Sequence, residues 1–341
     1  MTPAVHALLA RRAEVPAWVR RHLDRRRDDG TRRALALTRA LLDGLDAFAR
    51  AGIPVLALKG PALAQRLHGD VGVRDYDDLD LLVRPRDVAG ARATLAELGY
   101  VQQDQLPVHW ERDVARRLYV LLYRHPRTQV EIDLHWRWDP HVRDGEDVWS
   151  GARRIACGGR EIPTPGDEAL LVYLCVHGAR HAWSRLAWIR DVAALLESRA
   201  WSGASLTRRA RRAGAAKMLA FGVQLAHDVL GAPLPVRVAP ETARLAARTR
   251  RDLFREEGAL AAGWRRAALL WNLLDSAERA AFSLGRVRRL VTPTRADRAW
   301  VALPERLDPL YYAVRPLRLL LRGQSPVPGV GTSAARSSCA R

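Results

Sequence analysis

Two aspartates separated by one residue, Asp78 and Asp80, are the first feature of the sequence that points to chemistry. They lie in the run Asp-Leu-Asp-Leu-Leu-Val, whose alternation predicts a β-strand over 78–83. Side chains alternate between the faces of a strand, so the two carboxylates project together, about 7 Å apart, while Leu79 enters the core. Mg²⁺ takes one or two protein carboxylates together with water and substrate phosphates. The pair therefore indicates a magnesium site, and the alternative is the polar face of a solvated edge strand.

A second alternating segment, predicted as a strand over 129–136, carries Glu131, Asp133 and His135 on one face. If this strand lies beside the first, a third carboxylate completes a two-metal site for phosphoryl or nucleotidyl transfer. Asp133 is the preferred third carboxylate. Glu131 is the alternative, and it is either exposed or takes that role itself. The competing interpretation is one polar face of an antiparallel sheet.

A turn with a lysine, Lys59-Gly60, follows an apolar run at 53–58 that reads as a buried strand, and it opens a helix. The N-terminus of a helix presents backbone N–H groups and a positive dipole end to a phosphate. The lysine adds a point charge for a triphosphate, whereas Pro61 suits the first helical turn but has no N–H to donate. Arg74, in the loop before the acidic strand, is a further candidate for phosphate binding, and a solvated arginine is its default interpretation.

The elements that must position these residues alternate between strands and helices from residue 51 onward. After the acidic strand, a helix is expected from Pro85 to Gly99, followed by strands at 118–123 and 129–136. Helical patterns with interspersed tryptophans begin after Thr164-Pro-Gly-Asp167, which resembles a helix N-cap with proline at N1 and an acid at N3. The predicted fold class is α+β, a small mixed-sheet domain followed by a mostly helical one. The expected parts are a helical N-terminal segment at 1–50, an α/β domain at 51–155, a helical domain at 156–322 and a disordered tail at 323–341.

The helical half contains His177 and His181, four residues apart and so on one helix face, with Asp191 ten residues later. A zinc-protease helix would need a glutamate directly after the first histidine, and none is present. The three residues could form a metal site, a polar network that holds the helices together, or part of an acceptor or base pocket. The network is the preferred interpretation. The candidates for an acceptor pocket are His135, His177, His181 and Asp191.

The overall charge is strongly positive, since 56 Lys and Arg face 37 Asp and Glu, which gives +19 over 341 residues. Lys59 and Lys217 are the two lysines, so arginine dominates, as expected from a biased codon usage. Such a charge still favours polyanionic partners such as nucleotides, nucleic acid or anionic lipid. Aromatic residues do not interrupt the arginine runs at 25–27 and 208–212, and we therefore do not favour nucleic acid as a partner.

The composition also excludes several classes of protein. With 48% apolar and 27% charged residues, the chain is expected to fold rather than to be disordered. Its three cysteines form no Cys-x-x-Cys pair, which argues against a disulfide scaffold or a cysteine-rich zinc site. The absence of an apolar run of about 18 residues and of a signal-peptide core predicts a cytoplasmic protein with no membrane span.

Taken together, the motifs resemble the uncharacterised nucleotidyltransferase family of the DNA polymerase β-like nucleotidyltransferase superfamily. The resemblance covers about residues 50–200, and its motifs are Leu58-Lys-Gly60, Gly72-Val-Arg74, Asp78-Leu-Asp-Leu-Leu-Val83, Leu98-Gly-Tyr100, Asp133-Leu-His-Trp136, His177-Gly-Ala-Arg-His181 and Trp188-Ile-Arg-Asp191. One departure concerns the phosphate loop, which usually carries Gly-Gly or Gly-Ser in the superfamily. Here lysine precedes the glycine and proline follows it.

The resemblance implies a polymerase β-like fold and transfer of an NMP from an NTP with Mg²⁺, releasing pyrophosphate. It implies that Asp78, Asp80 and Asp133 are the catalytic and metal-binding residues and that the Lys59-Gly60 turn, with Arg74, binds the nucleotide. The partners expected are an NTP such as ATP and an acceptor hydroxyl on a small molecule or a protein. The alternatives are an inactive nucleotide- or RNA-binding module on the same fold, a metal-dependent phosphohydrolase, and a toxin-neutralising or protein-adenylylating partner.

Overall fold

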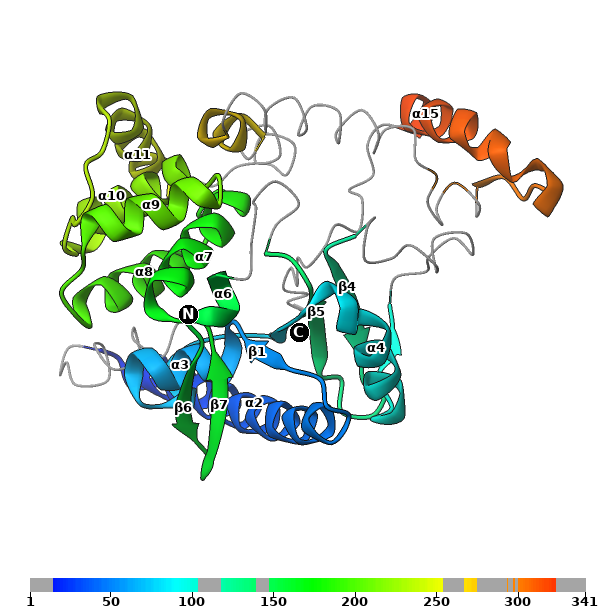
Figure 1. The fold of residues 1–341 in the computed structure, drawn as a ribbon, viewed down its shortest axis with the longest axis horizontal. Coiled ribbons are helices and arrows are strands. Elements are labelled where there is room, and N and C mark those ends of the chain that lie inside the picture. The colour runs from blue at the N-terminus through cyan, green and yellow to red at the C-terminus, as the bar shows by residue number, and fades with distance from the viewer. Residues whose placement is uncertain are drawn as a thin grey trace. The chain divides into compact units, whose positions relative to one another are not determined.

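The computed structural model describes residues 15–103, 118–138, 147–253, 267–274, 293, 297 and 300–322 (Figure 1). The chain divides into two units, Met1–Leu274 and Asp275–Arg341. The first unit contains a five-stranded sheet, a two-stranded hairpin and the helices from α2 to α11. The fold class is α+β, as predicted. The predicted disordered tail at 323–341 lies outside the described residues.

The sheet places the two acidic strands side by side. Its strands are β1 (Val55–Ala57), β2 (Asp78–Val83), β3 (Val101–Gln102), β4 (Val120–Arg124) and β5 (Glu131–His135). Their order across the sheet is β1-β2-β5-β4-β3, and β2 and β5 run parallel while the other neighbours are antiparallel. The adjacency that the two-metal hypothesis requires is therefore present, and the two acidic strands run parallel.

One face of this sheet is apolar and packs on helices. The helices of this part are α2 (Ala17–Arg50), α3 (Gly60–His68) and α4 (Val88–Glu97), with short 3₁₀ turns η1 (Val71–Val73) and η2 (Pro85–Asp87). Leu79 and Leu81 of β2 and Ile132 of β5 join residues of α2 and α4 in one buried core. Since strand side chains alternate, this burial directs the intervening acidic residues to the opposite face. Burial of the leucines thus determines where the carboxylates point.

The helical half begins with a hairpin that the sequence patterns do not predict. Strands β6 (Arg153–Cys157) and β7 (Arg160–Thr164) pair across Gly158-Gly159, where both glycines have positive φ. Thr164 therefore ends a strand, and α7 starts only at Asp167, with Gly166 as its N-cap. The predicted helix N-cap at Thr164, with Pro165 at N1, is wrong because Thr164 is the last residue of β7 and takes part in its strand pairing.

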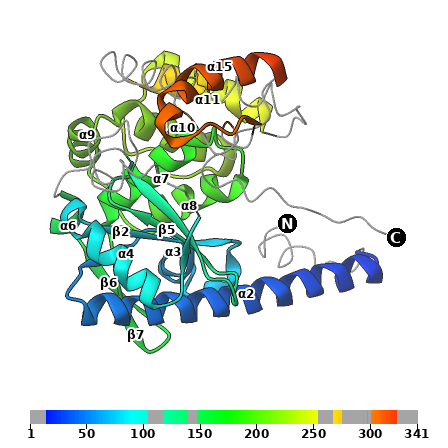
Figure 2. The ribbon, with the colours of Figure 1, turned by 90° about the vertical axis from the view of Figure 1, so that its right-hand side faces the viewer.

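The hairpin is followed by the helices α7 (Asp167–Arg180), α8 (Leu186–Glu197), α9 (Gly203–Arg212), α10 (Ala216–Leu230) and α11 (Pro240–Asp252). Figures 1 and 2 show them gathered on one side of the sheet, while α2 runs along the other side. Their core includes Tyr173 and Trp183, both almost fully buried. The acidic face of the sheet and the helical layer therefore belong to the same unit.

The second unit is described over 300–322, with residues 293 and 297. A 3₁₀ segment, η4 (Glu305–Leu310), leads into α15 (Tyr311–Arg322). The buried carboxylate of Asp297 pairs with Arg315 and Arg318 at 3.1 and 2.5 Å. In the part of the chain that the structure describes, every helix is too short or too polar to cross a bilayer.

Candidate functional site

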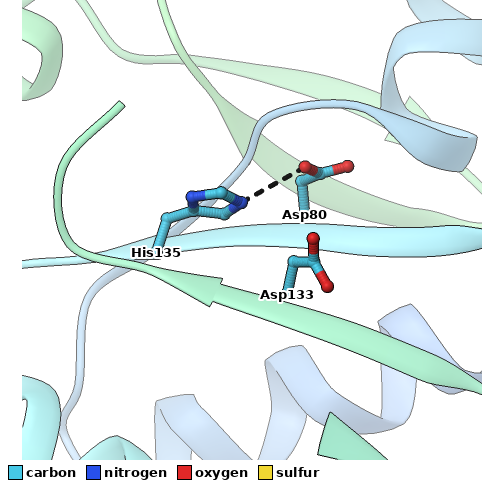
Figure 3. Close-up of side chains that lie close together, drawn as sticks. All are labelled: Asp80, Asp133 and His135. Carbon is cyan, nitrogen blue, oxygen red and sulfur yellow. Dashed lines mark hydrogen bonds and ion pairs between the residues drawn. The ribbon is translucent and has the colours of Figure 1, made fainter. Parts of the chain in front are cut away.

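The parallel register of β2 and β5 brings two carboxylates together. Asp80 lies opposite Asp133, and Asp78 lies opposite Glu131. The side-chain ligand atoms of Asp80, Asp133 and His135 lie within 4.8 Å of one another (Figure 3). All of these residues occupy alternate positions of their strands, so they share the face turned away from the apolar core. We refer to Asp78, Asp80, Asp133 and His135 as the carboxylate cluster.

Glu131 lies opposite Asp78 but forms an ion pair outside this cluster. Its carboxylate lies 3.7 Å from Arg124, its partner in the β4–β5 register, and both side chains are exposed. Asp133, one pleat further along β5, is half-buried beside Asp80. The geometry supports Asp133 rather than Glu131 as the third carboxylate.

Lys59 reaches the cluster from the end of β1. The Leu58 N–H donates to the carbonyl of Asp80 at 2.9 Å, which continues the β1–β2 pairing to the start of α3. The Lys59 ammonium then lies 2.9 Å from Asp80 Oδ1, and the two side chains are only 9% and 3% exposed. Gly60 has φ +63°, and a Cβ there would lie 3.3 Å from the Asp78 carbonyl, so the turn requires glycine.

His135 is the second neighbour of Asp80. Its Nε2 lies 3.3 Å from Asp80 Oδ1, the oxygen that Lys59 also contacts. The other oxygen, Asp80 Oδ2, is buried and has no hydrogen-bond partner among the described residues. A buried carboxylate oxygen without a donor is costly unless a ligand supplies the missing interaction.

The pKa values of the cluster show that it holds more negative charge than its surroundings compensate. Burial and the charge of Asp80 raise the pKa of Asp78 to about 6. Burial, with Asp80 and Asp78, raises the pKa of Asp133 well above its ordinary value. Burial also acts to raise the pKa of Asp80, but Lys59 and His135 outweigh it and bring that pKa below its usual range. Burial lowers the pKa of His135, so its imidazole is neutral at pH 7.

These residues fit a divalent cation. Carboxylate oxygens are the protein ligands that Mg²⁺ prefers, and neutral imidazole is also a ligand for Mn²⁺ and related metals. The unpartnered Oδ2 of Asp80 provides one vacant donor atom. The raised pKa values of Asp78 and Asp133 reflect burial first and then repulsion between the carboxylates, and a bound cation would offset both.

Arg74 is buried in an ion pair with Asp191 and is not exposed to solvent. Its Nε lies 3.0 and 2.9 Å from the two oxygens of Asp191, and its Nη2 lies 2.8 Å from Oδ2. Both side chains are buried, and they join the loop before β2 to α8. Arg74 Nη1 is buried without a hydrogen-bond partner among the described residues. The sequence grouped Asp191 with the histidines, and no local signal could have paired it with an arginine 117 residues earlier.

His177 of α7 and His181, the C-cap of the same helix, pack on α8. The rings of His177 and His181 have centroids 4.6 Å apart, and they lie 5.3 and 5.1 Å from the ring of Trp188. Burial lowers the pKa of His177 well below its ordinary value, and the charge of Lys59 acts in the same direction. The four residues predicted for an acceptor pocket thus make three different sets of contacts. His135 lies beside Asp80, His177 and His181 lie against Trp188, and Asp191 pairs with Arg74.

Three residues near the cluster were missed by sequence reasoning. Tyr173 of α7 is buried, and burial is the main reason that the pKa of its hydroxyl is raised. The negative charges of Asp80 and of the neighbouring aspartates raise it further. Arg180, at the end of α7, donates a hydrogen bond to the hydroxyl of Tyr119. The motif His177-Gly-Ala-Arg-His181 contained Arg180, but among so many arginines its type carried no signal.

Comparison with known proteins gives one family match. The family model described as uncharacterised nucleotidyltransferase matches residues 1–231 of this chain. A search of curated proteins found no match.

Three solved structures show a distant likeness. A solution structure of the antibiotic-resistance factor ANT(2'')-Ia is 18% identical, with a TM-score of 0.38 over 50% of this chain and 88% of the other. A crystal structure of ANT(2'')-Ia in complex with adenylyl-2''-tobramycin is 16% identical, with a TM-score of 0.31 over 69% and 97%. An antigenic nucleotidyltransferase-like protein from Paracoccidioides brasiliensis is 15% identical, with a TM-score of 0.37 over 57% and 88%. Because these sequence identities and TM-scores are low, the assignment of the site residues does not depend on these structures.

Proposed function

Because the chain belongs to the uncharacterised nucleotidyltransferase family, we propose that it moves a nucleoside monophosphate from a nucleoside triphosphate to an acceptor hydroxyl, releasing pyrophosphate. The observation that carries this proposal is the parallel pairing that sets Asp80 opposite Asp133 on the polar face of the sheet. The acceptor class covers a small molecule or a protein side chain that bears a hydroxyl.

Asp78, Asp80 and Asp133 are the residues that would hold Mg²⁺, and three carboxylates suffice for a two-metal site. When bound, the metal supplies positive charge that stabilises the attacking and leaving oxygens. Asp80 contributes the unpartnered Oδ2, and Lys59 keeps the charge of the buried Asp80 compensated. His135 contacts Asp80 from β5 and is a further donor within reach of both facing carboxylates.

The triphosphate is bound by the turn into α3 and by Arg74. Lys59 provides a cation, and Gly60 allows the close approach of the turn to β2. Arg74 is oriented by Asp191 through Nε and Nη2, which leaves Nη1 to donate to a phosphate oxygen. A guanidinium that is fixed before the ligand arrives loses little conformational entropy on binding.

The transfer step forms a bond between the acceptor oxygen and the α-phosphorus and breaks the bond from that phosphorus to the bridging oxygen. Pyrophosphate leaves with the electron pair of the broken bond. Asp133 is the carboxylate whose raised pKa suits it to take the acceptor proton, when it is not engaged as a ligand. The same residue thus serves as the second-metal ligand or as the base.

Thermal unfolding with each of the four NTPs, with and without Mg²⁺, tests the proposal. A ligand at 100 times its Kd should add about 2.7 kcal/mol of stability. We expect Mg²⁺-dependent stabilisation in the native chain that Asp80→Asn abolishes. The control is Asp43→Asn, an exposed carboxylate on α2 that is paired with Arg39.

A product assay then separates the remaining activities. Release of pyrophosphate, with the labelled nucleotide appearing on a small molecule or a protein, supports the transferase. Inorganic phosphate as the product would instead identify a phosphohydrolase. Binding without Mg²⁺ dependence, which also survives Asp80→Asn, would identify an inactive binding module.

A further inference from the structure

The last turn of α7 brings a cation from the helical layer toward the acidic face of the sheet. Arg180 is half-buried and folds over Tyr119, with its Cζ 4.8 Å from the ring centroid. Its Nη2 donates a hydrogen bond to the Tyr119 hydroxyl. Stacking and the hydrogen bond together restrict the guanidinium to one orientation.

Tyr119 connects this cation to the carboxylate cluster. It precedes β4, and its carbonyl accepts a hydrogen bond from the Trp136 N–H at 3.0 Å, directly beyond the end of β5. Its ring centroid lies 6.3 Å from that of His135, and His135 contacts Asp80. One tyrosine ring and one imidazole therefore separate Arg180 from the carboxylate that would hold the metal.

The charge of Arg180 acts on the cluster itself. After the larger effects of burial and of the neighbouring carboxylates, Arg180 lowers the pKa of Asp133. It also lowers the pKa values of His135 and His177, for which burial is again the main cause. Arg180 therefore lies close enough to the polar face of the sheet to act on a charged ligand held there.

We propose that Arg180 binds the β- and γ-phosphates of the nucleotide and then the leaving pyrophosphate, from the side of the helical layer. This inference rests on the proposed function. The proposed function places the α-phosphorus at the carboxylate cluster, where the metal would compensate its charge. The acceptor hydroxyl is neutral, so the outer phosphates are the anionic part of the substrate that a cation beside the cluster would bind. A guanidinium presents a planar fork of donors that matches phosphate oxygens, and Tyr119 orients this fork in advance.

The test measures Mg²⁺-dependent binding of pyrophosphate, of the most strongly bound NTP and of its monophosphate to native protein and variants. We expect Arg180→Gln to weaken pyrophosphate and NTP binding 10- to 100-fold and to change monophosphate binding less than twofold. Arg180→Lys should recover part of the loss, since it restores the charge without the fork. The matched control is Arg208→Gln, an exposed arginine on α9, which should bind all three ligands like the native chain.

A second variant, Tyr119→Phe, keeps the ring and removes the hydroxyl that receives the Arg180 hydrogen bond. It should weaken pyrophosphate binding several-fold, and it keeps the proposal testable if Arg180→Gln does not fold. Two outcomes for Arg180→Gln would overturn this assignment alone: an equal loss of monophosphate and triphosphate binding, or unchanged pyrophosphate binding. If Arg180→Gln does not fold, the same outcomes for Tyr119→Phe would overturn it. Failure of the native chain to bind any NTP with Mg²⁺ would overturn the proposed function together with it.

Discussion

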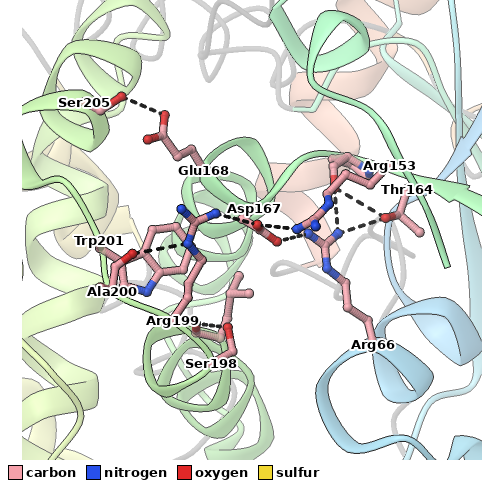
Figure 4. A network of polar contacts seen from close by, with 12 residues as sticks. Arg66, Arg153, Thr164, Asp167, Glu168, Ser198, Arg199, Ala200, Trp201 and Ser205 are labelled. Carbon is pink, nitrogen blue, oxygen red and sulfur yellow. Dashed lines mark hydrogen bonds and ion pairs between the residues drawn. The ribbon is translucent and has the colours of Figure 1, made fainter.

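Two clusters of charged side chains in the first unit have opposite ratios of acidic to basic groups. At the start of α7, a single carboxylate, that of Asp167, is shared by the three guanidinium groups of Arg66, Arg153 and Arg199 (Figure 4). The Arg153 and Arg199 contacts measure 2.5 and 2.8 Å. This group joins α3, β6 and the end of α8 to the first turn of α7.

On β2 and β5 the ratio is reversed. Three carboxylates share one face of the sheet, and Lys59 contacts one of them, Asp80. The pKa values follow this difference. Burial acts to raise the pKa of Asp167, yet its arginines bring it below the ordinary value, whereas burial and Asp80 raise the pKa of Asp78 to about 6.

The comparison separates a group that is complete from one that requires a ligand. Asp167 has all of its charge compensated by the protein, so its contribution is to stability. The carboxylate cluster retains a charge surplus and an unpartnered oxygen on Asp80, which is the arrangement that the proposed function requires of a cation site. Four predictions test this distinction, beginning with the largest effect.

Asp133→Asn should reduce the rate of transfer by about 10³-fold, because it removes a metal ligand or the base for the acceptor proton. The rate of pyrophosphate release under saturating NTP measures the effect. Asp167→Asn, the matched change in the compensated group, should leave the rate of the folded protein within a few-fold. Comparable losses in the two variants would remove the distinction between the groups.

Asp167→Ala should instead lower the free energy of unfolding by about 3 kcal/mol, because it leaves three guanidinium groups without their shared carboxylate. Denaturant unfolding at pH 7 measures this loss. The pKa of Asp167 is lowered in the folded state, so its stabilisation is present above its ordinary pKa of 3.8 and is lost as the pH falls below it. The difference between the native chain and the variant should therefore shrink as the pH falls through the lowered pKa of Asp167, and a difference that does not shrink in acid would contradict the ion-pair explanation.

Asp78→Asn should have the opposite sign and stabilise the metal-free protein by about 2 kcal/mol at pH 8. The folded-state pKa of Asp78 is raised from 3.8 to about 6, so native stability falls as the pH rises through this interval and the carboxylate ionises. Thermal unfolding in EDTA from pH 3 to 8 measures the divergence, which should vanish below pH 4. With saturating Mg²⁺ the order should reverse, and a variant that is less stable than native in EDTA at pH 8 would refute the charge surplus.

Lys59→Gln should tighten Mn²⁺ or Mg²⁺ binding by about fivefold in the absence of nucleotide, because it removes a cation 2.9 Å from Asp80 Oδ1. The same variant should bind the Mg²⁺–NTP complex more weakly, since the lysine also serves the triphosphate. Calorimetric titration with the metal alone and then with the nucleotide measures both. Lys217→Gln is the control for the loss of a lysine.

Local patterns were sufficient for much of the fold and of the candidate site. The alternation in 78–83 predicted both β2 and the face shared by its aspartates, because residues of one strand are related by a fixed twofold period. The turn at Lys59-Gly60 was also predicted, and in the structure Gly60 has the positive φ that glycine readily adopts. The β6–β7 hairpin was missed because its strands are short and largely exposed, without a clear apolar alternation.

By itself, the sequence determined which residues could do chemistry and on which side of each strand they lie. Only the tertiary structure decided which of them meet. The β2–β5 register set Asp80 opposite Asp133, and the packing of α8 on the loop before β2 paired Arg74 with Asp191. The physical reason is that strand periodicity is a property of consecutive residues, whereas register and ion pairing depend on how the apolar faces of distant elements are buried together.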